Sequence, residues 1–143
     1  MLVEKFANSD SNKAIVAIFF DHWFCGRLEE ALALVTEDFS LIIPGDPQKL
    51  AMAGTYTKNN FVDVLGLISK YMINGVKADI TLLMVEGDDA ILIGKSSGIT
   101  LNQKPYENDV CYNLKLRDGK ICHIRLFLDT LRAQELVEDS KRF

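Results

Sequence analysis

Three side chains of this 143-residue sequence have the chemistry needed to act on a carbonyl compound. Tyr112 falls on the apolar face of a predicted strand, where its hydroxyl could donate a hydrogen bond to a carbonyl oxygen. His22, in the segment DHWF, could move a proton near neutral pH. Asp46, in the loop after Ile43, could reach a pocket mouth as a displaced carboxylate. Such groups suit an isomerase, cyclase or dehydratase that acts beside a carbonyl.

Each of these positions also has a purely structural interpretation. A buried tyrosine hydroxyl needs a hydrogen-bond partner, so Tyr112 can equally be a satisfied core residue. His22 lies at the edge of a predicted helix face, where Phe19 and Trp23 take the interior positions. Asp129, between the last predicted strand and the last helix, is interpreted as an N-cap and not as a catalytic acid.

Other residues are candidates for contact with a ligand. Lys95 and Ser97 interrupt an apolar strand face, and a buried lysine can serve as a base or a Schiff-base amine. The alternative is an exposed face, because lysines are rarely fully buried. Asn108 shares the face of Tyr112 and could orient a ligand or lie in solvent. Trp23 supplies apolar lining or plain core.

Helices come first in the sequence and strands follow. Asp10 or Ser11 could cap the first helix, and Gly26 ends it. The apolar spacing predicts helices over 12–26, 27–38, 58–75 and 130–139, and strands over 39–43, 78–86, 89–101, 105–117 and 120–128. This order predicts an α+β fold, in which a curved, mostly antiparallel sheet packs on N-terminal helices and encloses a pocket.

The register of the last two strands decides which side chains face that pocket. A two-residue turn would pair the apolar face of one strand with the polar face of the other. We therefore predict a three-residue loop, Arg117–Gly119, whose glycine is left-handed. Tyr112 then points inward, and Cys111 and Cys122 fall on opposite faces, which excludes a disulfide between them.

The composition limits the kinds of partner. The net charge is −4 and no cluster of Lys and Arg stands out, which argues against nucleic acid. No run approaches the ~18 apolar residues of a membrane span, and the N-terminus lacks the pattern of a signal peptide. A cytoplasmic location without membrane contact is expected. The three cysteines have no metal-like spacing, so we expect reduced thiols and neither metal nor cofactor.

Three segments carry a family resemblance: GRLEEALALVTEDFSL (26–41), AGTYTKNNFVDVL (53–65) and LRDGKICHIRLFLDT (116–130). Together with the order of elements, they resemble the SnoaL-like, ketosteroid isomerase-like proteins of the nuclear transport factor 2-like superfamily, over roughly residues 11–137. The resemblance implies one domain over residues 1–143, a cone-shaped, cystatin-like α+β roll, an apolar pocket and a homodimer built on the sheet. It also implies that Tyr56, after Gly54, lies at the pocket rim.

The resemblance permits a comparison with ketosteroid isomerases, which use a general-base Asp and an oxyanion hole made of a Tyr and a protonated Asp. When the glycine at the helix end is aligned with Gly26, the Tyr position falls on Phe19 and the base on Ile43. The second Asp position falls near Tyr112. Phe19 cannot donate a hydrogen bond and Ile43 cannot take a proton, so only Tyr112 could polarise a carbonyl.

The final hairpin is also similar to that of limonene-type epoxide hydrolases, which activate water through an Asp–Arg–Asp relay. One Asp position of that relay is Leu126 here, and the other two positions fall within residues 94–97. The Asp on which SnoaL-type cyclases rely also falls near Leu126. None of these Asp positions carries a carboxylate in this sequence. Phe19, Ile43 and Leu126, which take the places of catalytic side chains, are therefore predicted to line a pocket without acting as acids or bases.

Three functions remain open on these observations. The leading one is a homodimeric pocket protein that binds a small, largely apolar molecule, with an isomerase or lyase of ketosteroid isomerase type as its enzymatic form. The second is a non-catalytic carrier or sensor of a small ligand. The third is a protein-interaction module that uses the outer sheet face, which would carry Cys111, Asn113, His123 and Arg125.

Overall fold

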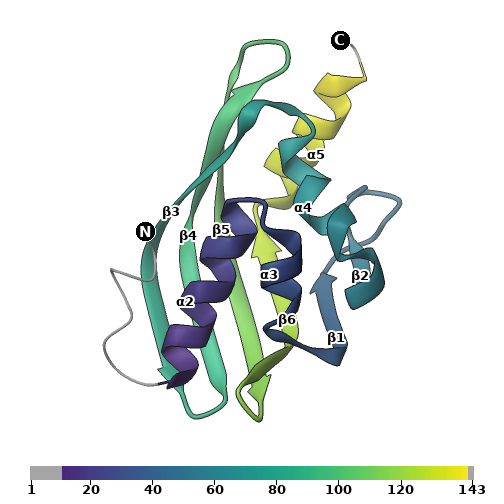
Figure 1. Ribbon diagram of the computed structural model, residues 1–143. Helices are drawn as coiled ribbons and strands as arrows, with labels where there is room; N and C mark the ends of the chain where they lie inside the picture. The colour runs from purple at the N-terminus through teal and green to yellow at the C-terminus, as the bar shows by residue number, and fades with distance from the viewer. Residues whose placement is uncertain (1–10, 142–143) are drawn as a thin grey trace.

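The computed structural model describes residues 11–141 and shows an α+β fold (Figure 1). Residues 1–10, which include Asp10 and carry the prediction that no signal peptide is present, lie outside the described residues. The elements in chain order are α2 (Ser11–Phe24), α3 (Leu28–Leu32), β1 (Val35–Ile43), β2 (Gly54–Thr57), the 3-10 helix η1 (Lys58–Asn60), α4 (Phe61–Ser69), β3 (Met72–Glu86), β4 (Asp89–Thr100), β5 (Pro105–Arg117), β6 (Lys120–Leu128) and α5 (Thr130–Ser140).

The six strands form one curved sheet in the order β2-β1-β6-β5-β4-β3. All neighbouring strands are antiparallel except β1 and β6, which are parallel. In Figure 1, α2, α3 and α4 lie on the face of the sheet turned to the viewer. On β5 every second residue from Tyr106 to Leu116 is buried, so one face of this long strand meets the interior. The predicted α+β fold with a curved sheet packed on N-terminal helices is confirmed.

The second helix is shorter than predicted, because the segment after it joins the sheet. It ends at Leu32, and β1 already begins at Val35 instead of Phe39. Val35 is buried and lies opposite Ile121 of β6, whose backbone N–H donates to the carbonyl of Leu34 at 2.9 Å. Pairing with a strand distant in sequence thus overrides the helical pattern of the local sequence.

The third predicted helix also ends early, at Ser69, and Met72 begins β3 instead of closing the helical stripe. Asn74 and Gly75 have left-handed backbones, with φ of 62° and 81°. Between Ile73 and Lys77 the pairing of β3 with β4 is irregular. The chain therefore passes from α4 into the sheet through a bulged segment that is not helical.

The β5–β6 hairpin keeps the predicted pairing of apolar faces by a different device. Its turn has two residues, Asp118 and Gly119, both left-handed with φ of 52° and 77°, so the predicted three-residue loop is wrong. Cys122 is an extra residue in β6, placed between the pairs Leu116–Ile121 and Lys115–His123. This bulge shifts the register by one residue and brings apolar side chains opposite one another again. For example, Tyr112 lies opposite Leu126.

The carboxylate that ends the hairpin is a helix cap, as predicted. A side-chain oxygen of Asp129 accepts a hydrogen bond from the backbone N–H of Arg132 at 3.1 Å, at the start of α5. The three cysteines are free, also as predicted.

Candidate functional site

A cavity of about 540 Å³ lies between the inner face of the sheet and helices α2 and α4. Its walls come from the end of α2 and the turn after it, from most of α4, from the bulged start of β3, and from β4, β5 and β6. The lining is mostly apolar. The residues that line it are Trp23, Phe24, Cys25, Gly26, Ile43, Met52, Val64, Leu65, Gly66, Leu67, Ile68, Ser69, Asn74, Gly75, Val76, Ser96, Tyr106, Asn108, Val110, Tyr112, Leu126 and Leu128.

The hydroxyl of Tyr112 is a polar group of the lining that is available to a ligand. The Tyr112 ring is 5% exposed and is held by Phe20 and Trp23, whose ring centroids lie 4.7 and 5.4 Å from its own. Every buried polar side-chain atom among the described residues has a hydrogen-bond partner, yet the Tyr112 hydroxyl bonds to none of these residues. Its oxygen is therefore open to the cavity and free to donate a hydrogen bond to a bound molecule.

Asn108 also lines the cavity, but its amide is fully engaged in the protein. Its Nδ2 donates to the hydroxyl of Tyr106 at 2.8 Å and to the carbonyl of Asp129 at 3.0 Å. Its Oδ1 accepts from the backbone N–H of Asp129 at 2.9 Å. Asn108 is 4% exposed, and it fastens the junction of β6 and α5 to the cavity wall. These hydrogen bonds indicate that Asn108 holds the junction of β6 and α5 in position.

Burial raises the pKa of the Tyr112 hydroxyl well above its usual value of 10. The hydroxyl therefore keeps its proton, and remains a donor, across the physiological pH range.

The same shift predicts a loss of stability in alkali. In the unfolded chain Tyr112 ionises near pH 10, whereas the folded protein retains the proton, so the folded state binds more protons above pH 10. Stability must then fall as pH rises, by up to about 1.4 kcal/mol per pH unit for this one group. We expect urea unfolding between pH 9 and 11 to show a shallower fall for Tyr112→Phe than for the wild type, since Tyr56 and Tyr106 contribute equally to both. Parallel curves would contradict a buried, protonated Tyr112.

The lining residues given above include no Asp, Glu, His, Lys or Arg. Ile43 and Leu126, the positions at which related enzymes would carry a carboxylate, do face the cavity. The site can thus donate hydrogen bonds to a ligand oxygen, but it has no carboxylate or imidazole to accept a proton. Within residues 11–141 no three His, Cys, Asp or Glu side chains cluster in a way that could hold a metal ion.

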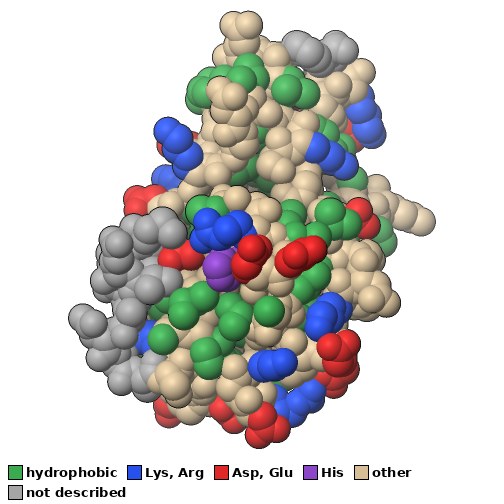
Figure 2. All heavy atoms as spheres, in the orientation of Figure 1, with side chains coloured by type: hydrophobic (Ala, Val, Ile, Leu, Met, Phe, Trp, Pro, Cys, Tyr) green, Lys and Arg blue, Asp and Glu red, His purple; other side chains and the backbone are tan. Residues whose placement is uncertain are grey.

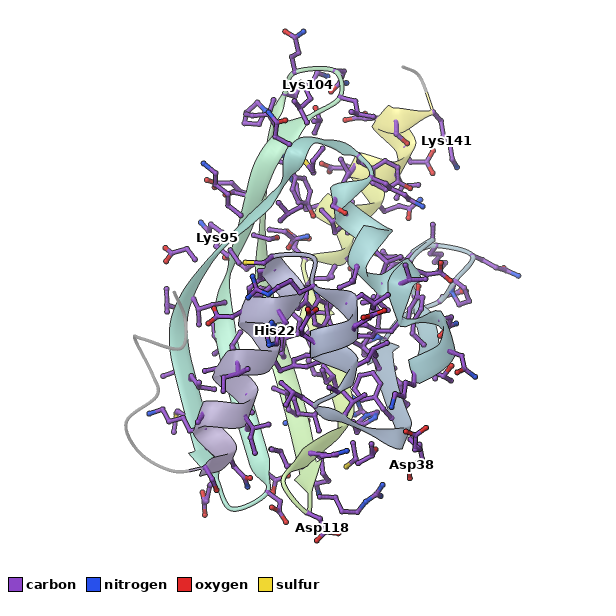
Figure 3. The ribbon with its side chains drawn as sticks, in the orientation of Figure 1. His22, Asp38, Lys95, Lys104, Asp118 and Lys141 are labelled. Atoms are coloured by element: carbon purple, nitrogen blue, oxygen red, sulfur yellow. The ribbon has the colours of Figure 1, made fainter. Side chains whose placement is uncertain are left out.

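The two predicted proton carriers, His22 and Asp46, lie outside this lining. Nδ1 of His22 accepts a hydrogen bond from Nε of Arg27 at 2.8 Å, and the histidine reaches the surface among charged side chains (Figures 2 and 3). Asp46 is exposed, and its Oδ1 accepts from the backbone N–H of Gln48 at 2.9 Å. Both side chains are engaged locally, and neither is brought to the Tyr112 hydroxyl.

Four predicted ligand contacts are likewise not part of the lining. Lys95 points outward from the sheet, with Nζ 3.7 Å from a carboxylate oxygen of Glu107 (Figure 3), and Ser97 lies on the same outer face. Phe19 is wholly buried in the core. The hydroxyl of Tyr56 donates to the backbone carbonyl of Met52 at 2.8 Å.

The structure brings to the cavity several residues that sequence reasoning missed. Ser96, and not its neighbours Lys95 and Ser97, faces inward on β4; alternation from the buried Leu92 could have shown this. Tyr106 shares the inward face of Tyr112, which the same alternation could have revealed. No sequence signal identified the wall formed by α4.

Comparison with known proteins supports the fold and the family. The family model for the SnoaL-like domain matches residues 16–124. No curated protein sequence matches the chain. No helix among residues 11–141 has the length and apolar character to cross a membrane.

Several solved structures have the same fold. TerC, co-crystallised with polyporic acid, has a TM-score of 0.78 at 18% identity and covers 90% of this chain and 99% of its own. An NTF2-like protein from Burkholderia xenovorans LB400 has a TM-score of 0.69 at 25% identity, over 88% and 95% of the two chains. A putative SnoaL-like polyketide cyclase from Jannaschia sp. CCS1 has 0.73 at 14%, over 89% and 91%. The chain belongs to the SnoaL-like domain family, within the nuclear transport factor 2-like superfamily.

Proposed function

We propose that this protein binds a small, largely apolar molecule that carries a carbonyl oxygen, and that the Tyr112 hydroxyl donates a hydrogen bond to that oxygen. One observation carries the proposal: Tyr112 is a buried residue whose hydroxyl has no partner among the described residues and is open to a mostly apolar cavity. A donor in such surroundings favours a ligand oxygen, because a polar group left unpaired when a ligand covers it costs free energy.

Binding accounts for the cavity more simply than proton-transfer catalysis does. An isomerase, cyclase or dehydratase of the expected kind needs a group that accepts a proton within reach of the substrate. The polarising donor is present in Tyr112, whereas the lining has no carboxylate or histidine. TerC, crystallised with polyporic acid, supports a small organic ligand for this fold, and the structure named as a putative SnoaL-like polyketide cyclase supports a polyketide as one class of such ligands.

Replacement of Tyr112 with Phe tests the hydrogen bond. We expect Tyr112→Phe to weaken binding of a simple ketone, 2-decanone, about fivefold, as for loss of one neutral hydrogen bond. Binding can be followed by the fluorescence of Trp23, the only tryptophan of the chain, which lines the cavity. Tyr71→Phe is the matched control, because Tyr71 is not part of the lining. Equal affinities of wild type and Tyr112→Phe would refute the assigned role.

We also propose that a second copy of the chain covers the outer face of the sheet. Two adjacent rows of paired residues expose large apolar side chains on this face, chiefly on β3 and β4; one row reaches Phe127 of β6 through Cys111, and the other continues with Asn113 and Arg125. We name this set the outer apolar patch, and its members are Leu82, Met84, Ile91, Ile93 and Phe127. Their exposed fractions range from 37% to 61%, and charged pairs such as Lys95–Glu107 border them. An apolar centre with a polar rim is the anatomy of a protein interface.

A further inference from the structure

The cavity follows the inward face of β5 over a considerable length. Four successive inward residues of this strand, Tyr106, Asn108, Val110 and Tyr112, all line it. Six residue steps separate the two tyrosines, which corresponds to about 20 Å between their Cα atoms on an extended strand. The floor is thus long, and each end of it carries a phenol.

The hydroxyl of Tyr106 is oriented differently from that of Tyr112. It accepts a hydrogen bond from Nδ2 of Asn108 at 2.8 Å, and Asn108 is itself fixed by Asp129. The Tyr106 hydroxyl donates to no described residue. A hydroxyl that accepts a hydrogen bond becomes a stronger donor, because the bonds polarise each other. Tyr106 is also a lining residue of the cavity, so its hydroxyl proton remains available for a hydrogen bond to a ligand.

The floor between these hydroxyls is apolar in effect. The Asn108 amide is already hydrogen-bonded to Tyr106 and Asp129, and the next inward residue is Val110. Leu126 and Leu128 of the neighbouring strand extend the apolar surface. A ligand that matches this strand has an apolar middle and a polar atom at each end.

We propose that the ligand is an elongated molecule with an apolar centre and a hydrogen-bond acceptor oxygen at each end, one held by Tyr112 and the other by Tyr106. This inference rests on the proposed binding function and specifies the class of ligand. Both donors are neutral, since burial raises the pKa of each tyrosine hydroxyl.

Two series of probes test the length and the two-ended recognition. One series consists of linear diketones with a methyl ketone at each end, of about eight to fourteen carbons, and the other of 2-ketones of the same lengths. Each is titrated against the wild type with Trp23 fluorescence as the readout. We expect diketone affinity to peak at one chain length, where both oxygens reach a hydroxyl, whereas 2-ketone affinity rises steadily with apolar area. Diketone affinity that rises without a peak would contradict two-ended recognition.

Two variants separate this inference from the proposed function. Tyr106→Phe should weaken the best diketone about fivefold, and should weaken the 2-ketone of the same length by less, because a 2-ketone has only one oxygen to hold. Tyr112→Phe should weaken both kinds of ketone, and Tyr71→Phe neither. If Tyr106→Phe binds the diketone as the wild type does while Tyr112→Phe does not, two-ended recognition is wrong and the proposed function stands. If no ketone gives a saturable signal with the wild type, both are wrong.

Discussion

Replacement of Val110 with Phe is expected to weaken ketone binding about 100-fold while the protein stays folded. Val110 lies in the middle of the cavity floor, between Asn108 and Tyr112, and is 7% exposed. A phenyl ring at this position would occupy the space of the ligand. Displacement of roughly 100 Å² of apolar contact costs about 2.5 kcal/mol, which corresponds to the expected loss. The ring enters an existing space, so the melting temperature should stay the same or rise.

The matched control is the same substitution at Val62, a residue of α4 that is 55% exposed and outside the lining. Val62→Phe should bind 2-decanone as the wild type does. Isothermal titration calorimetry gives the affinities, and differential scanning calorimetry shows that both variants fold. A folded Val110→Phe protein with unchanged affinity would mean that the ligand lies elsewhere.

Replacement of Ile93 with Lys is expected to convert a dimer into a monomer. Ile93 lies on β4 in the outer apolar patch, between Leu82 of β3 and Cys111 of β5. In a dimer with two-fold symmetry, both copies would place the substituted lysine in the interface. Two unpaired charges would then be buried. An unpaired buried charge costs about 3 to 5 kcal/mol, so the dimer dissociation constant should rise by more than about 100-fold. Ile93 is 38% exposed in the single chain, so the fold should tolerate lysine.

Sedimentation equilibrium over a concentration series measures the association directly. Val62→Lys is the control, because it places the same charge on α4, away from the outer apolar patch. The wild type and Val62→Lys should sediment as dimers and Ile93→Lys as a monomer. A monomeric wild type at high concentration, or a dimer that survives Ile93→Lys, would contradict the assignment of the patch to a second copy.

The architecture was predictable because the local sequence marks where most of the strands begin and end. The ends of β5 and β6 fall where the sequence predicts them, at turns and at breaks in the apolar alternation. Misplaced boundaries share one physical cause. Val35 and Met72 continue helical apolar patterns but belong to strands, because pairing with distant strands decided their conformation. The bulge at Cys122 was also not predictable, because nothing in the sequence distinguishes an unpaired apolar residue of a strand from a paired one.

The candidate site was predictable only in part, because a shift of one residue reverses the facing of a strand. Tyr112 and Asn108 line the cavity as the alternation on β5 indicated. On β4 the choice of Lys95 and Ser97 was off by one residue, and Ser96 faces inward. That Asn108 is engaged while the Tyr112 hydroxyl is open depends on three-dimensional contacts, which no spacing in the sequence records.

The vibration of a ligand carbonyl tests the central claim most directly. 2-Decanone labelled with ¹³C at its carbonyl can be bound to the wild type and to Tyr112→Phe and examined by difference infrared spectroscopy. A hydrogen bond from Tyr112 weakens the carbonyl bond, so we predict a lower stretching frequency in the wild type than in Tyr112→Phe, with Tyr71→Phe like the wild type. The same frequency in all three proteins would contradict the claim that the Tyr112 hydroxyl holds the ligand's oxygen in this cavity.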